Sequence, residues 1–196
     1  MNYHFARRRA DRIVEILSPF VSRIDIAGSI RRLKPTVKDI EICCIPKTEF
    51  VNTDLFGAGH HVRVKEFAAA IKQFEKSVIK GNPDGRYMQI VLVGSEDMKL
   101  DLFMPQESDY YRQLAIRTGS ADYSHQVLAV AWQKLGWVGT SDGLRKSYQC
   151  IRKSESGKPK WVCTHPNPEL PPIWNSEQEL FHWLNLDYLE PQFRNV

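Results

Sequence analysis

Two carboxylates two residues apart, Asp39 and Glu41, are the first residues whose types and spacing point to chemistry. They lie in V-K-D-I-E-I-C-C-I at residues 37–45, which alternates early and becomes apolar later, as a central strand does. Side chains at i and i+2 of a strand share a face, so the two carboxylates would stand about 6.6 Å apart along it. They would repel each other unless a cation, such as a divalent metal ion, lay between them. The alternative is a solvent-exposed strand face.

A third carboxylate, Asp101, stands alone among strand-forming apolar residues in K-L-D-L-F-M at residues 99–104. If that strand lies beside residues 37–45, Asp101 joins Asp39 and Glu41. Three carboxylates together form the ligand set of a two-metal phosphoryl-transfer site. One ion then activates the attacking hydroxyl, and the other holds the triphosphate and the leaving pyrophosphate. We therefore expect two Mg²⁺ ions, which Mn²⁺ can replace.

Gly28 and Ser29, followed by Arg31 and Arg32, are candidates for binding those phosphates. A glycine lets the backbone approach a phosphate closely, and the following N–H groups and the serine hydroxyl can donate to its oxygens. The arginines would add charge-assisted hydrogen bonds. For a Gly-Ser pair taken alone, the alternative is a simple turn after a strand.

In combination, these motifs resemble a known family. G-S-I-R-R at 28–32, D-I-E at 39–41 and Asp101 resemble the nucleotidyltransferase superfamily, and specifically the palm of family X DNA polymerases, which include DNA polymerase beta. R-T-G-S-A at 117–121, followed by a helix, resembles that family's T-G-S motif between palm and thumb. L-D-Y-L-E-P-Q-F-R at 186–194 resembles the Y-x-x-P-x-x-R ending of its thumbs. The resemblance spans nearly the whole chain and is nearest to short palm-plus-thumb proteins of phage-like or bacterial type.

The resemblance implies a role for each motif. Asp39 and Glu41 would bind both metal ions. Asp101 would bind the catalytic ion and assist removal of the proton from the primer 3′-hydroxyl. The residues implied to bind the nucleotide are Gly28, Ser29 and Arg32 at the triphosphate, and Gly119 and Ser120 at the sugar.

The sequence also departs from the family pattern. Glu41 stands where these polymerases usually have aspartate, and its longer arm changes where the ligand oxygens reach. Ile116 and Arg117 replace an aromatic pair that discriminates against ribose, so we expect Arg117 to make a phosphate or sugar contact of its own. Ser124, a further candidate for nucleotide binding, replaces an asparagine that contacts the base, and Leu128 replaces an arginine that contacts the template. Sugar choice and accurate templated synthesis are therefore left open.

Positive charge is concentrated in the first quarter of the sequence. Residues 1–48 have a net charge of +5 and the remainder −1, within a total of +4. The N-terminal helix carries the densest cluster, and we predict that its Arg8 and Arg12 contact DNA phosphates. One alternative is salt bridges with Asp11 and Glu15 on a solvated helix face. Another is a contact between one of the arginines and the terminal phosphate of the nucleotide.

The expected fold is α+β. A nucleotidyltransferase palm at residues 1–117, with a mixed β-sheet and helices on one face, precedes a small α+β thumb at 118–196. Apolar periodicity and chain breakers place the elements. We expect helices at 3–17, 30–33, 64–77, 122–135 and 176–184, strands at 23–27, 37–45, 86–93, 99–104, 147–153 and 160–164, a loop at 54–61, and turns at 81–85 and 95–97.

The last two strands form a predicted β-hairpin. A two-residue turn at 156–157 would make Cys150 face Cys163 and Arg152 face Trp161. We expect the facing cysteines to be reduced thiols. The four cysteines of the chain are too few and too oddly spaced for a structural zinc site.

Length and composition exclude several classes of protein. The chain has 196 residues, 42% hydrophobic and 26% charged, the balance of a globular protein rather than a disordered one. No apolar run approaches the ~20 residues that a transmembrane helix needs. Residues 1–10 lack the apolar core of a secretory signal. We therefore expect no membrane partner and a cytoplasmic location, in a bacterium or a phage-infected host.

The function expected from the sequence is nucleotidyl transfer to a DNA 3′-hydroxyl, as in gap filling or short repair-type extension, with release of pyrophosphate. The expected partners are a nucleoside triphosphate and primer/template or gapped DNA, and the protein is expected to be a monomer. The alternatives are transfer to RNA 3′ ends or to a protein hydroxyl, as in antitoxin-type enzymes, and a catalytically silent DNA-binding module. The T-G-S thumb favours DNA, and an unused cluster of three like charges would be electrostatically costly.

Overall fold

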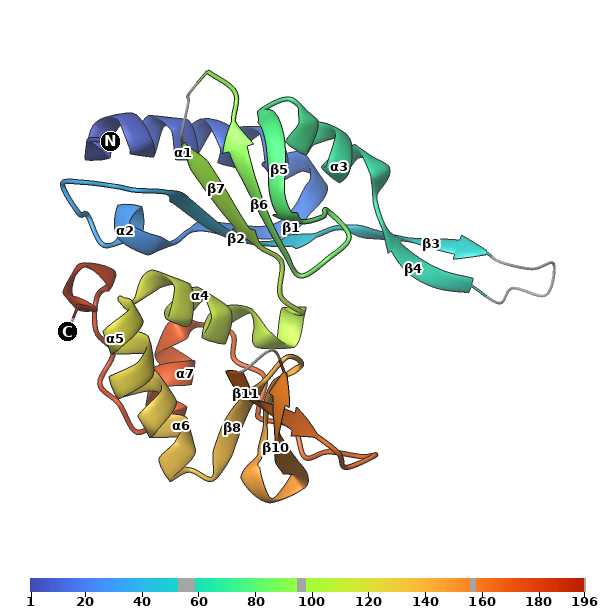
Figure 1. The fold of residues 1–196 in the computed structure, drawn as a ribbon, viewed down its shortest axis with the longest axis vertical. Coiled ribbons are helices and arrows are strands. Elements are labelled where there is room, and N and C mark those ends of the chain that lie inside the picture. The colour runs from blue at the N-terminus through green and yellow to red at the C-terminus, as the bar shows by residue number, and fades with distance from the viewer. Residues whose placement is uncertain (53–58, 95–97, 156–157, 196) are drawn as a thin grey trace.

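The N-terminal half folds around a five-stranded mixed sheet, within an α+β fold as predicted (Figure 1). The computed structural model describes residues 1–52, 59–94, 98–155 and 158–195. In spatial order the strands are β1 (Val21–Ile26), β2 (Ile40–Pro46), β7 (Lys99–Phe103), β6 (Tyr87–Leu92) and β5 (Glu75–Gly81). β2 and β7 pair in parallel, and the other neighbours pair antiparallel.

Two helices cover one face of this sheet (Figure 1). They are α1 (Tyr3–Leu17) and α3 (Lys65–Lys72). Each has an apolar stripe that packs on alternate strand residues, including Ile42 and Leu100. Because successive strand residues point to opposite faces, Glu41 and Asp101 lie on the other face. The short helix α2 (Gly28–Arg31) follows β1.

Helix α4 (Tyr110–Thr118) lies on the face that carries the carboxylates and connects the two halves of the chain. Its Tyr110 and Leu114 pack against Cys43 and Phe103 of the sheet. Its Ala115 belongs to the core of the second half. This double contact explains why the segment mixes apolar and polar residues without one clear stripe.

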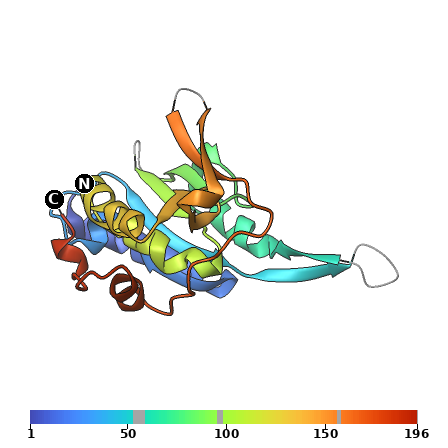
Figure 2. The ribbon, with the colours of Figure 1, turned by 90° about the horizontal axis from the view of Figure 1, so that it is seen from below.

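The C-terminal half contains a four-stranded sheet in the order β10-β11-β8-β9. Its strands are β8 (Trp137–Thr140), β9 (Gly143–Lys146), β10 (Cys150–Glu155) and β11 (Lys158–Cys163). Its helices are α5 (Ala121–Tyr123), a π-helical segment (Ser124–Ala129), α6 (Val130–Lys134) and α7 (Glu177–Trp183). Short 3₁₀ turns along the chain are at Ser18–Phe20, Glu107–Asp109, Ser147–Gln149 and Pro191–Phe193. Figure 2 shows the β10–β11 hairpin standing away from the helices.

The predicted register of that hairpin is confirmed. Cys150 pairs with Cys163, and Arg152 pairs with Trp161. The turn predicted at 156–157 lies outside the described residues, as does the turn predicted at 95–97. The β8–β9 pair was not predicted from the sequence.

Two predictions between residues 48 and 81 are wrong. The helix expected at 64–77 ends at Lys72, and the chain enters β5 at Glu75. Phe74 continues the apolar periodicity because it is buried in the turn between them, which disguises the end of the helix. The turn predicted at 81–85 is present, except that Gly81 is the last residue of β5.

The second error concerns a ribbon of two strands, β3 (Thr48–Asn52) and β4 (Gly59–Arg63), which extends away from the sheet (Figure 1). Residues 59–61 of the predicted loop belong to β4, and the rest of that loop lies outside the described residues. Most ribbon residues are exposed, so no burial imposes the alternating pattern that would reveal a strand. No helix in the described ranges is long and apolar enough to cross a membrane.

Candidate active site

Parallel pairing of β2 and β7 places Glu41 directly opposite Asp101. Asp39 lies at the bend just before β2, rather than within the strand as predicted. Burial, followed by the charges of Asp39 and Asp101, raises the pKa of Glu41 to about 7. Burial and the charge of Asp101 also raise the pKa of Asp39. The structure therefore brings Asp101 near enough to Asp39 and Glu41 for its charge to raise the pKa of both.

Asp101 is held by two donors from the adjacent strand β6. The hydroxyl of Tyr87 and Nε2 of Gln89 (2.9 Å) both donate to its Oδ1. Gln89 lies directly opposite Asp101 in the antiparallel register of β6 and β7. Neither donor was identified from the sequence. The sequence feature that points to them is their alternation with the buried Met88 and Ile90, which places Tyr87 and Gln89 on the face of the sheet opposite the core.

The carboxylate cluster suits a divalent cation in its chemistry. In the part of the chain that the structure describes, no three His, Cys, Asp or Glu side chains are already arranged as a metal-binding group. Carboxylate oxygens are nevertheless the ligands that Mg²⁺ prefers. Burial is the main cause of the raised pKa of Glu41, and the negative charges of Asp39 and Asp101 add to it; a cation would offset both effects. Metal binding at Asp39, Glu41 and Asp101 is therefore a proposal that fits the residues present.

Gly28 lies against this cluster. Its φ of +62° is in the left-handed region, and a Cβ on this residue would stand 1.9 Å from Oε2 of Glu41. The glycine therefore makes room for a carboxylate, a role that the sequence did not suggest. The Oγ of the adjacent Ser29 is buried and has no hydrogen-bond partner among the described residues. Such a hydroxyl is available to donate to a ligand oxygen.

Arg31 and Arg32 connect this turn to the end of α4. Arg31 donates from Nη1 to Oγ1 of Thr118 (2.7 Å) and from Nη2 to Glu177 (2.6 Å). Arg32 donates from Nη1 to the carbonyl oxygen of Thr118 (2.5 Å). Its Nε is buried without a partner among the described residues, and burial lowers its pKa. Arg32, predicted to bind triphosphate, thus already has one structural contact.

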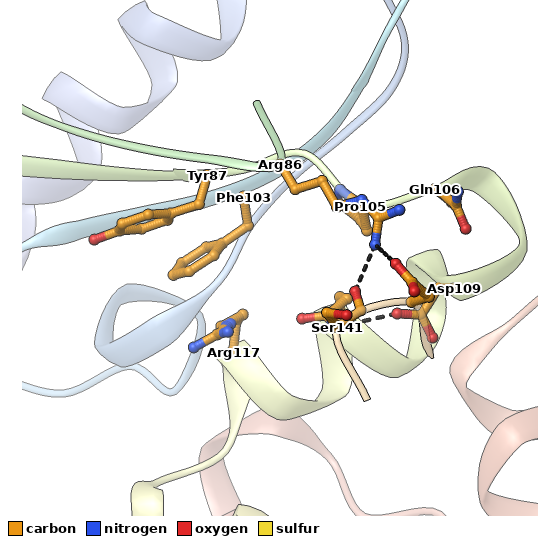
Figure 3. Close-up of a pocket in the computed structure, with 10 residues that line it drawn as sticks. Arg86, Tyr87, Phe103, Pro105, Gln106, Asp109, Arg117 and Ser141 are labelled. Carbon is orange, nitrogen blue, oxygen red and sulfur yellow. Dashed lines mark hydrogen bonds and ion pairs between the residues drawn. The ribbon is translucent and has the colours of Figure 1, made fainter. Parts of the chain in front are cut away.

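Arg117 extends from α4 over the sheet (Figure 3). Its guanidinium carbon lies 4.1 Å from the centroid of the Phe103 ring, and that ring contacts Tyr87 at 5.2 Å between centroids. The Arg117 charge partly offsets the effects that raise the pKa of Glu41. The prediction that Arg117 lies at the site is consistent with this placement, whereas its contact with phosphate or sugar stays a prediction.

A cavity of about 180 Å³ lies beside this stack of side chains. Figure 3 shows Tyr87, Phe103 and Arg117 on one part of its wall. On another part, Arg86 donates to the carbonyl of Ser141 and, at 3.0 Å, to Asp142. These contacts join the sheet to the β8–β9 turn of the second half.

The T-G-S motif forms the corner between α4 and α5. The Ser120 hydroxyl caps α5 by accepting from the N–H of Tyr123 (3.0 Å). The Ser124 hydroxyl donates to the carbonyl of Ile116 (2.8 Å). A Cβ on Gly119 would stand 2.7 Å from the Tyr123 ring, so the corner has no room for a side chain. All three residues have roles within the fold, and their predicted contacts with the nucleotide stay predictions.

Arg8 and Arg12 are not brought to the carboxylates, because α1 covers the opposite face of the sheet. Arg12 is paired with Glu15 (2.5 Å), and Arg7, which directly precedes Arg8, is paired with Asp11 (2.8 Å). Both pairs match the salt-bridge alternative considered for this helix. Contact with DNA phosphates stays a prediction for Arg8 and Arg12.

A buried ion network near the corner was missed by sequence reasoning. Glu177 of α7 accepts from Arg31 and also from Nη1 of Arg194 (2.6 Å). Burial alone would raise the pKa of Glu177, but the hydrogen bonds and charges of the two arginines lower it. Arg194 is fully buried, and its carbonyl accepts from the N–H of Ser120 (3.0 Å). The network therefore fixes the end of the second half against α2 and the T-G-S corner.

Comparison with known proteins finds a similarity for the second half of the chain. A search of curated proteins found no significant match. Residues 113–195 match the family model of the DNA polymerase beta thumb. The matched segment begins within α4 and contains the T-G-S corner, the four-stranded sheet and Arg194. This part of the chain is therefore similar to the thumb of DNA polymerase beta.

Proposed function

We propose that the protein is a nucleotidyltransferase of the family X DNA polymerase type. It would transfer a nucleotide from a nucleoside triphosphate to a DNA 3′-hydroxyl and release pyrophosphate. The observation that carries the proposal is the pairing of Glu41 with Asp101 on one sheet face, with Asp39 just before β2 and near enough for its charge to act on Glu41, next to a segment similar to a polymerase thumb. Gap filling or short extension fits this combination.

The side chains of the site would divide the work. Asp39, Glu41 and Asp101 would hold Mg²⁺ or Mn²⁺, which lowers the pKa of a coordinated hydroxyl and neutralises phosphate charge when bound. Tyr87 and Gln89 fix the orientation of the Asp101 carboxylate through their hydrogen bonds. This fixed carboxylate is placed to assist loss of the proton from the primer hydroxyl.

The triphosphate would lie at the turn after β1. The Ser29 hydroxyl and the Arg32 Nε are buried donors without partners among the described residues, and Arg32 is near enough to Glu41 to feel its charge. Arg117 has a buried Nε of the same kind and lies near Glu41. Phosphate oxygens would satisfy these donors, since a buried donor left unpaired is costly. DNA would be held by the thumb.

A transfer assay with three acceptors tests the proposal. The protein is incubated with Mg²⁺, labelled deoxynucleotides or ribonucleotides, and either gapped DNA, single-stranded DNA or RNA. We expect extension of the gapped DNA, and a loss of at least a thousandfold for Asp101→Asn. Asp84→Asn, which changes an exposed carboxylate away from the cluster, is the matched control and should keep full activity.

Three results would contradict the proposal. Label on RNA alone would show that the acceptor is an RNA 3′ end, and label on the protein would indicate transfer to a protein hydroxyl. DNA binding without transfer of any label would indicate a silent binding module.

A further inference from the structure

Cys150 and Cys163 lie directly opposite each other near the base of the β10–β11 hairpin. The N–H of Thr164 donates to the carbonyl of Gln149 at 3.0 Å, and these are the residues just outside the pair. In an antiparallel ladder this pattern marks the enclosed residues as a non-hydrogen-bonded pair, with Cα atoms about 4.5 Å apart. Disulfides form at Cα separations of about 4.4–6.8 Å. The backbone therefore already holds the two cysteines within bonding range.

The two thiols also interact and differ in access. Burial, followed by the charge and hydrogen bond of the Cys163 thiol, raises the pKa of Cys150. Cys150 is 9% exposed, whereas Cys163 is only partly buried. A reagent from solvent therefore meets Cys163 first, with Cys150 in contact behind it.

The remaining cysteines cannot form such a pair. Cys43 and Cys44 are consecutive on β2, so their side chains point to opposite faces of the sheet. Both are fully buried, and burial raises the pKa of Cys44 to about 12. They provide an internal control, because neither is open to a reagent in the folded protein.

We propose that Cys150 and Cys163 are a modification site at which a low-molecular-weight disulfide, such as glutathione disulfide, forms a reversible cross-strand disulfide. The Cys163 thiolate attacks one sulfur of the reagent, and one glutathione leaves as its thiolate. The Cys150 thiolate then attacks the Cys163 sulfur of the mixed disulfide and releases the second glutathione. Two protein thiols lose two electrons and two protons, and the reagent is reduced to two thiols.

The bond would be reversible and would act locally. Excess reduced glutathione would reverse the bond, because thiol–disulfide exchange runs in both directions. β11 joins β8 through a single residue pair, Trp161 and Thr140, and β10 is an edge strand. The hairpin is therefore held mainly by its own ladder, and the disulfide would lock its base. This inference stands on the hairpin geometry and does not rest on the proposed function.

Peptide mapping of the oxidised protein tests the proposal. Reduced protein is treated with glutathione disulfide, alkylated, and digested with trypsin, which cleaves after Arg152 and Lys160 and so separates Cys150 from Cys163. We expect the two peptides to be recovered joined by a disulfide, and to separate again after excess reduced glutathione. Cys43 and Cys44 should react with the alkylating reagent only after denaturation.

Two variants test the order of attack. Cys150→Ser should stop at a single glutathione adduct on Cys163, because the second thiol is missing. Cys163→Ser should react at least tenfold more slowly than the wild type, because Cys150 is buried. The proposal fails if the wild type also stops at a stable adduct on Cys163, or if Cys150 stays a free thiol after complete oxidation. The wild-type map decides the question even if a variant folds poorly.

Discussion

The carboxylate of Glu41 occupies the space in which residue 28 would carry a side chain, so Gly28 and Glu41 form one structural unit. A Cβ on Gly28 would stand 1.9 Å from Oε2 and 2.7 Å from Cδ of Glu41. The turn after β1 and the carboxylate strand β2 therefore depend on each other, apart from any phosphate that the turn binds.

Gly28→Ala should lose more stability than a positive φ alone explains, because the new methyl group must displace Glu41. Gly136→Ala is the matched control, since Gly136 has φ +79° and a Cβ there would meet nothing within 4 Å. A left-handed backbone costs an L residue about 1–2 kcal/mol. Gly136→Ala should lose only this amount of unfolding free energy, and Gly28→Ala should lose more. Urea unfolding of both variants measures the difference, and equal losses would contradict a clash with Glu41.

Asp101→Asn should leave the metal-free midpoint of thermal unfolding level or higher, because it relieves repulsion with Asp39 and Glu41. Mg²⁺ or Mn²⁺ should raise the midpoint of the wild type with increasing concentration, since an ion that binds only the folded state stabilises it. The variant should respond much less. A large fall in the metal-free midpoint would instead indicate that the main role of Asp101 is structural.

The Glu177 network should make stability depend on acid pH. The pKa of Glu177 is lower in the folded protein than its ordinary value of 4.5, so its contribution is present above that pH and is lost as the pH falls through the folded pKa. At pH 7, Glu177→Gln should cost about 3 kcal/mol, because it breaks a buried pair. The difference from the wild type should shrink below pH 4.5 in urea unfolding, and a constant difference would contradict the ionic role.

Arg32→Ala should weaken nucleoside triphosphate binding about ten- to a hundredfold, the value of one charge-assisted hydrogen bond. The same change removes its bond to the Thr118 carbonyl, so unfolding must be measured alongside nucleotide titration. Arg8→Ala, on the opposite face, is the control. Unchanged nucleotide affinity with reduced stability would limit Arg32 to its contact with Thr118.

Replacing both Arg8 and Arg12 by alanine should reduce the slope of log DNA affinity against log salt by up to about 1.8, because each phosphate contact contributes about 0.9. Replacing Arg152 and Lys153 by alanine removes the same charge from the β10–β11 hairpin and serves as the comparison. Titration of duplex DNA across a salt series measures both. An unchanged slope would assign the α1 arginines to surface pairs such as Arg12–Glu15.

Elements with one buried face were predictable because the core imposes a period on their residues. The bounds of α1 agree with the prediction, since its apolar stripe is complete and Asn2 and Ser18 flank it. Strands β6 and β7 agree within a residue at each end, because their alternate side chains enter the core. The β3–β4 ribbon has no core behind it and therefore no such pattern.

The carboxylates of the candidate site were predictable from the sequence, but the long-range contacts that hold the surrounding residues in place were not. Asp39, Glu41 and Asp101 are unusual residues in otherwise apolar segments, so sequence alone marks them. The contacts of Arg31 and Arg32 with Thr118 join residues more than eighty positions apart. No local pattern reports such contacts, because they arise only when both halves have folded.

The large sequence separation of these contacts also affects the expected order of folding. Arg31 reaches Glu177 across 146 positions of sequence, whereas Arg194 reaches it across 17. Closing the longer loop carries the larger entropic cost, so the contact between Glu177 and Arg194 can form while the second half folds. Arg31 would complete the triad only when the two halves dock. We therefore expect each half to form its own core first and the two halves to join late in folding.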